Sequence, residues 1–118
     1  MTPTDIILHQ KSKVLEVAFD DDTRYKLPAE FLRVFSPSAE VRGHGKGQET
    51  LQVGKRDVGI TSIEPVGQYA LKINFDDGHD TGLYSWEYLH EMGQYQAGMW
   101  HDYLGKLEAA GKSRDSKQ

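Results

Sequence analysis

The segment FDDGHDTGLYSWEYL, Phe75 to Leu89, passes from an acidic turn into a short strand and then into a helix. Asp76 to His79 predicts a hairpin turn, because Gly78 can take the positive φ that tight turns require. Thr81 to Tyr84 should return as a strand. Ser85 is a favourable helix N-cap residue, so we expect a helix to begin directly after that strand.

Alternating apolar residues predict further strands upstream of this segment. From Tyr69 to Phe75 every second side chain is apolar, which indicates one buried face and one wetted face. Val14 to Phe19 and Thr23 to Leu27 alternate in the same way around a run of three aspartates, which is typical of a hairpin. The segments expected to form strands are residues 5–9, 14–19, 23–27, 58–63, 69–75 and 81–84.

Two regions have the features of helices. Residues 28–35 begin with a proline, which suits a first helical turn, and a Ser-Pro pair after them ends the helix. Over residues 85–110, apolar and aromatic side chains recur at near-helical spacing, and Gly93 and Gly98 predict a bend or break. The expected fold class is therefore α+β: a mainly antiparallel β-sheet of hairpins, a short helix near 28–35 and a C-terminal helical segment near 85–110.

The composition restricts the classes of protein that this chain can represent. Its 118 residues suit one domain over residues 1–110, and residues 111–118 are so poor in apolar side chains that we expect a disordered tail. A net charge of −4 argues against nucleic-acid binding. The absence of cysteine excludes thiolate ligands and thiol nucleophiles in this chain. No apolar run approaches the ~20 residues of a membrane span, so we expect a cytoplasmic protein that does not bind membranes.

Histidine spacing does not support an enzyme. The chain has five histidines: His9, His44, His79, His90 and His101. No pair has the His-x-x-x-His spacing that places two imidazoles on one helix face, and the His-x-Asp core of a non-haem iron triad is absent. A Gly-x-Ser-x-Gly nucleophile elbow is also missing. We therefore expect no catalytic residues.

The most irregular part of the sequence is SPSAEVRGHGKGQET, residues 36–50. A long glycine-bearing loop in a small domain is either functional or disordered. It lacks the Gly-Lys-Ser/Thr ending of a phosphate-binding loop, no clear strand leads into it, and no helix follows it. A phosphate site is therefore not expected here.

Three stretches together resemble the gamma-butyrobetaine hydroxylase-like N-terminal domain family, in the bacterial stand-alone form that is known as a domain of unknown function. They are LRVFSPSAEVRGH (residues 32–44), GITSIEPVGQYA (59–70) and FDDGHDTGLYSWEYL (75–89). In the large eukaryotic enzymes of this family, the domain precedes an iron(II)/2-oxoglutarate dioxygenase domain. The resemblance covers nearly the whole chain, from about residue 5 to about residue 110.

The resemblance implies a zinc site that this chain does not retain. In the eukaryotic relatives, three cysteines in a Cys-Pro-Cys-x-x-Cys pattern and one distant histidine hold zinc. The cysteine positions fall on Ser36, Ser38 and Val41, and the histidine falls on His79. Because structural zinc sites use strong nitrogen and sulfur donors, we expect that the structural zinc is lost.

The resemblance also implies that the 36–44 loop meets the turn that contains His79. The residues that would then line one polar patch are Ser36, Ser38, Glu40, Arg42, His44 and His79. Two interpretations remain open. The patch is a hydrogen-bonded network in place of the zinc, or His79 and His44 are candidate ligands, with Glu40, for a weakly held zinc or iron ion.

The resemblance does not transfer hydroxylase activity, because the dioxygenase domain is absent from these 118 residues. We expect a non-catalytic accessory or protein-interaction domain without a cofactor, whose partner is another protein. The alternative is a metal-binding accessory protein linked to metal or iron–sulfur handling, since some relatives join this domain to iron–sulfur carrier ATPases.

Overall fold

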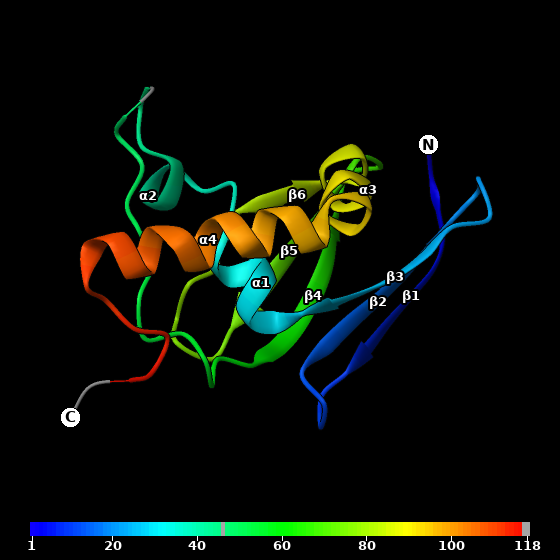
Figure 1. The fold of residues 1–118 in the computed structure, drawn as a ribbon. Helices are drawn as coiled ribbons and strands as arrows, with labels where there is room; N and C mark the ends of the chain where they lie inside the picture. The colour runs from blue at the N-terminus through cyan, green and yellow to red at the C-terminus, as the bar shows by residue number, and fades with distance from the viewer. Residues whose placement is uncertain (46, 117–118) are drawn as a thin grey trace.

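The computed structural model describes residues 1–45 and 47–116, and within them the chain forms two antiparallel sheets and four helices (Figure 1). This confirms the α+β class, although the strands divide into two sheets rather than one. In chain order the elements are β1 Pro3–His9, β2 Val14–Phe19, β3 Arg24–Pro28, α1 Ala29–Val34, α2 Ala39–Arg42, β4 Ile60–Val66, β5 Ala70–Phe75, β6 Leu83–Ser85, α3 Trp86–Gln94 and α4 Gln96–Ala110.

The first sheet has the strand order β1-β2-β3 and contains the hairpin expected from the aspartate run. Leu15 pairs with Leu27, and Val17 pairs with Tyr25. Leu15, Val17 and Leu27 have no exposed surface, so one face of this sheet lies in the core. Asp22 takes a positive φ of 68° in the β2–β3 turn.

The second sheet has the strand order β4-β5-β6. Leu71, Ile73 and Phe75 of β5 are buried, as the alternation predicts. Tyr69 was expected on the same buried face, but it lies in the β4–β5 turn and is 74% exposed. The turn is shorter than expected because β4 continues to Val66.

The C-terminal helical segment is divided into two helices, as predicted, at a single break. Tyr95 separates α3 from α4, while Gly98 lies inside α4 without interrupting it. Gly93 matters for packing instead: a Cβ atom there would lie 2.2 Å from Cγ of Tyr25, so only glycine permits α3 to approach β3 this closely. The short helix α2 was not predicted; its N-cap is Ser38, whose side chain accepts a hydrogen bond from the Glu40 amide.

One continuous core joins the two sheets. Its buried side chains come from β2 and β3, from α1, from β4 to β6 and from α3. Val34 of α1 forms a smaller cluster with Tyr103 and Leu107 of α4. Figure 1 shows α4 across the front of α1 and β5, with α2 beside the C-terminal half of α4. Among the helices of the described chain, none has the length and apolar character needed to cross a membrane.

The segment after α4 returns to the domain, which differs from the expected disordered tail. The Gly54 amide donates to the Ser113 carbonyl at 3.0 Å, and the Arg56 amide donates to the Arg114 carbonyl at 2.9 Å. The Arg114 guanidinium also binds both carboxylate oxygens of Glu30, at 2.7 and 2.8 Å. Residues 117 and 118 of the expected tail lie outside the described residues.

Candidate functional site

His79 lies in the turn between β5 and β6 and has only 6% of its surface exposed. Its Nδ1 atom is 3.2 Å from a carboxylate oxygen of Glu40, and its Nε2 atom is 2.8 Å from Oγ of Ser36. A carboxylate only accepts hydrogen bonds, so the Glu40 carboxylate beside Nδ1 favours the tautomer with the proton on Nδ1. In the neutral ring, Nε2 then accepts a hydrogen bond from the Ser36 hydroxyl.

The two serines hold the loop before α2 against the His79 turn. Ser36 has no exposed surface, and its Oγ also accepts a hydrogen bond from the Ser38 amide at 3.2 Å. The Ser38 hydroxyl lies 2.8 Å from the hydroxyl of Thr81. Gly82 permits the loop to lie this close to the turn, because a Cβ atom at position 82 would lie 2.5 Å from Ser36 Oγ.

The surroundings of His79, and above all its burial, favour the neutral imidazole. Burial lowers the pKa of His79, and the nearby Arg33 guanidinium lowers it further, while the Glu40 and Asp77 carboxylates act in the opposite direction. Burial disfavours the charged form of Asp77. Hydrogen bonds from Lys55 Nζ at 2.7 Å, the His79 amide and Arg33 Nε at 2.9 Å outweigh this effect and lower the pKa of Asp77 to about 2.

The four positions that correspond to zinc ligands in the family do not fit a zinc ion. Both ring nitrogens of His79 already have partners, and the hydroxyls of Ser36 and Ser38 bind neighbouring protein groups. Val41 is a buried core side chain without a donor atom. In residues 1–45 and 47–116 no group of three or more histidine, aspartate or glutamate side chains is placed to hold a metal ion.

The six residues of the predicted polar patch divide into three groups. Ser36, Ser38, Glu40 and His79 form the hydrogen-bonded network described above. Arg42 belongs to a different contact, with its guanidinium carbon 4.7 Å from the centroid of the Tyr88 ring. His44 is exposed, and in the described chain no hydrogen bond or ion pair joins it to His79.

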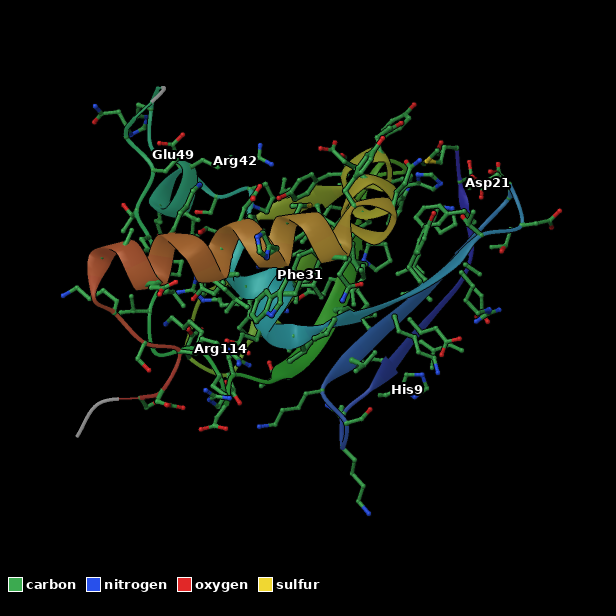
Figure 2. The ribbon with its side chains drawn as sticks, viewed as in Figure 1. His9, Asp21, Phe31, Arg42, Glu49 and Arg114 are labelled. Atoms are coloured by element: carbon green, nitrogen blue, oxygen red, sulfur yellow. The ribbon has the colours of Figure 1, made fainter. Side chains whose placement is uncertain are left out.

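A cleft of about 380 Å³ lies beside this network, between the α1–α2 region, the 49–52 segment and α4. Its walls are mainly apolar, and charged side chains stand at its edge; Figure 2 shows two of them, Arg42 and Glu49, at α2. The lining residues are Val34, Phe35, Ser36, Val41, Arg42, Glu49, Thr50, Leu51, Gln52, Tyr88, Tyr103 and Lys106.

Two tyrosines of the cleft have their hydroxyls bound to the protein. The Tyr88 hydroxyl donates to the Phe35 carbonyl, and the Tyr103 hydroxyl donates to the Gln52 carbonyl, each at 2.6 Å. Burial raises the pKa of Tyr103 to about 12, so its hydroxyl stays protonated and the side chain is neutral at ordinary pH. These tyrosines therefore present ring surface to a ligand rather than free hydroxyls.

The fold and this site define a class of protein: a small α+β domain in which a buried histidine network fixes a loop beside an apolar cleft. The chain belongs to the gamma-butyrobetaine hydroxylase-like N-terminal family, whose model matches residues 6–90. The resemblance noted in the sequence is thus confirmed. No curated protein matches the chain significantly.

Several solved structures are similar to the chain, among them two NMR structures and one crystal structure. Two NMR solution structures are 54% and 47% identical, with TM-scores of 0.86 and 0.83; each matches 99% of this chain, over 92% and 87% of their own lengths. A crystal structure from Acidithiobacillus ferrooxidans ATCC 23270, of a protein of unknown function in the DUF971 family, is 35% identical with a TM-score of 0.66. That match covers 78% of this chain and 92% of the other. These relatives establish the fold and the family without assigning an activity.

Proposed function

We propose that this domain is a non-catalytic accessory module of the cytoplasm that binds a partner protein through the cleft between α2 and α4. The observation that carries the proposal is the cleft itself, with its apolar walls and its satisfied tyrosine hydroxyls. A cavity of about 380 Å³ with few free polar groups suits the burial of one or two large apolar side chains. Burial of such side chains is a principal source of binding energy at protein interfaces.

The geometry of the histidine network argues against catalysis. Ser36, His79 and Glu40 follow the order nucleophile, base and orienting acid that hydrolytic triads use. However, Ser36 has no exposed surface although it borders the cleft, and its Oγ is already engaged by His79 and the Ser38 amide, so it is poorly placed to attack a substrate carbonyl. The network is better explained as a structural lock that replaces a metal.

A steric block of the cleft tests the proposal. Thr50 is exposed at the cleft, and its hydrogen bonds to Val41 and Gln52 use only its backbone amide and carbonyl. Thr50→Trp should therefore fill the opening without disturbing the loop. Thr4→Trp, on the exposed side of the edge strand β1, is the matched control. Proteins that cross-link to each tagged variant in cells of the source organism are identified by mass spectrometry, and each candidate is then purified and titrated.

The proposal predicts a protein that is captured by the wild type and by Thr4→Trp but lost with Thr50→Trp. The purified partner should shift the NMR signals of cleft residues such as Leu51 and Tyr103. If the purified partner binds Thr50→Trp as tightly as the wild type, the cleft is not the docking site and the proposal is wrong.

A further inference from the structure

We propose that the partner segment carries a carboxylate next to its apolar side chain, and that Arg42 and Lys106 bind this carboxylate at the edge of the cleft. This inference rests on the proposed function and specifies the chemistry of the partner. It commits to one occupant: a short acidic and apolar peptide segment of another protein.

Arg42 is held in position for this task by a chain of contacts. The Tyr88 hydroxyl is fixed on the Phe35 carbonyl, which orients the ring, and the Arg42 guanidinium lies over that ring. A guanidinium stacked on an aromatic ring keeps its N–H groups free at the edge, where they can bind a carboxylate in bidentate fashion. Because the side chain is already ordered, less conformational entropy is lost when the ligand binds.

Lys106 approaches the cleft from the other side, on α4. Both cations are exposed, and within residues 1–45 and 47–116 neither forms an ion pair with a carboxylate. The other arginines of the described chain do form such pairs: Arg24, Arg33, Arg56 and Arg114.

Glu49 is the one acidic residue among those that line the cleft, so the cleft has two cations and one anion in a chain with a net charge of −4. The local excess of positive charge at the cleft thus contrasts with the rest of the molecule. At physiological salt, charges more than about 8 Å away are largely screened, so the charged residues of the lining, with one positive charge in excess, weigh most on a ligand in the cleft. A neutral or basic segment would leave these cations without a partner.

Three synthetic peptides test the inference by NMR titration of the ¹⁵N-labelled full chain. The acidic probe is Ac-Ser-Glu-Phe-Asp-Ser-NH₂, its neutral twin is Ac-Ser-Gln-Phe-Asn-Ser-NH₂, and its apolar-deficient twin is Ac-Ser-Glu-Ala-Asp-Ser-NH₂. We expect the acidic probe to shift cleft amides and to bind up to about fivefold more tightly than its neutral twin, the size expected for one exposed charge-assisted contact. It should also bind more tightly than the apolar-deficient twin, because alanine buries less apolar surface than phenylalanine. Its affinity should also fall as sodium chloride is added.

Two charge variants test whether Arg42 and Lys106 cause the preference for the acidic probe. Arg42→Gln and Lys106→Gln should each weaken the acidic probe by about threefold to fivefold and leave the neutral twin unchanged. Lys11→Gln, which removes one exposed cation in the β1–β2 turn, is the matched control and should not change either affinity.

Each remaining outcome contradicts a defined part of the proposal. If the acidic probe and its neutral twin bind the cleft equally well, the carboxylate inference is wrong while docking through the cleft survives. If sodium octanoate binds more tightly than the acidic probe, the occupant is a small carboxylic acid and the peptide proposal is wrong. If all three peptides leave the cleft amides unchanged at millimolar concentration, docking of short segments in this cleft is also contradicted.

Discussion

His79 has both ring nitrogens engaged by protein groups, so the residue that would bind zinc in relatives acts here as a structural link. The link joins two segments that lie 43 residues apart, the loop before α2 and the β5–β6 turn. Helix α2, which follows this loop directly, supplies the Val41 and Arg42 side chains of the cleft. The network therefore fixes one wall of the proposed binding site.

The lowered pKa of His79 predicts how stability depends on pH. The unfolded chain takes up a proton on this histidine near its ordinary pKa of about 6.5, whereas the folded chain does so only at lower pH. The unfolded state thus binds more protons just below pH 6.5, and the free energy of unfolding decreases as the pH falls through that region. Urea unfolding between pH 7.5 and 5 should show this decrease, and it should be smaller in His79→Gln.

The wild type and His79→Gln share the other four histidines, so the difference between their pH dependences of unfolding free energy isolates the contribution of His79. The groups that face His79, namely Arg33, Glu40 and Asp77, are also unchanged in the variant. Equal pH dependence in the two proteins would show that the His79 imidazole does not have a lowered pKa in the folded state.

Gly82 should not tolerate a methyl group. In Gly82→Ala the new Cβ would lie 2.5 Å from Ser36 Oγ and 3.1 Å from Pro37 Cδ, so the loop must move away from the His79 turn. We expect a loss of about 1–3 kcal/mol in the free energy of unfolding, the usual cost of overpacking. Gly105→Ala is the matched control: this helical glycine has no atom within 4 Å of the added Cβ, and the change should stabilise α4 by about 0.5–1 kcal/mol. Denaturant unfolding that gives both variants the same sign would refute this account of Gly82.

Sequence alone revealed part of this site at the level of single residues. The meeting of Ser36 and Ser38 with His79 was predictable only through the family resemblance, because spacing does not show which loops meet in space. His44 was grouped with them for its position in the motif, yet the chain turns away at Gly43, which has a φ of 75°. No sequence pattern predicts the cleft, because its lining comes from segments as far apart as residues 34 and 106.

Element boundaries were predictable where local signals are strong. The alternation of β5, the proline before α1 and the Ser85 N-cap each mark an element correctly, since backbone sterics and capping act within a few residues. The four-residue helix α2 is too short to show an apolar period. The division into two sheets also has no local signal, because it depends on which strands pair.

The segment after α4 makes a prediction of its own, because Arg114 holds it against α1. The Glu30 side chain is only 9% exposed, so removal of its partner leaves a nearly buried carboxylate without a counterion. Arg114→Gln should cost about 2 kcal/mol, less than for a fully buried pair because the Arg114 side chain is 27% exposed. Thermal and urea unfolding measure this loss.

Arg56→Gln provides the matched control in the same region. Its ion pair with Asp115 joins two exposed side chains, and such pairs contribute about 0–1 kcal/mol. In the double variant Glu30→Gln, Arg114→Gln, the cost should be smaller than for Arg114→Gln alone, because no charge is left buried. Equal losses for Arg114→Gln and Arg56→Gln would contradict a special role of the Glu30 pair.

At the scale of the whole molecule, the two sheets share one core and should unfold together. Leu15 and Val17 of β2 belong to the same buried cluster as Leu71 and Ile73 of β5, although the two sheets share no strand pairing. Small domains with a continuous core unfold cooperatively, so amides in both central strands should exchange only through global unfolding. Native-state hydrogen exchange should therefore give the same opening free energy for β2 and β5.

A single core substitution tests whether the two sheets unfold together. Ile73 of β5 has no exposed surface, and Ile73→Val should cost about 0.5–1.5 kcal/mol through one lost methylene. Because the core is shared, the opening free energy of the β2 amides should fall by the same amount as that of β5, although Ile73 has no strand partner in the first sheet. Ile7→Val, on an exposed position of β1, should lower neither value by more than a few tenths of a kcal/mol. A loss confined to β5 would mean that the two sheets are separate folding units.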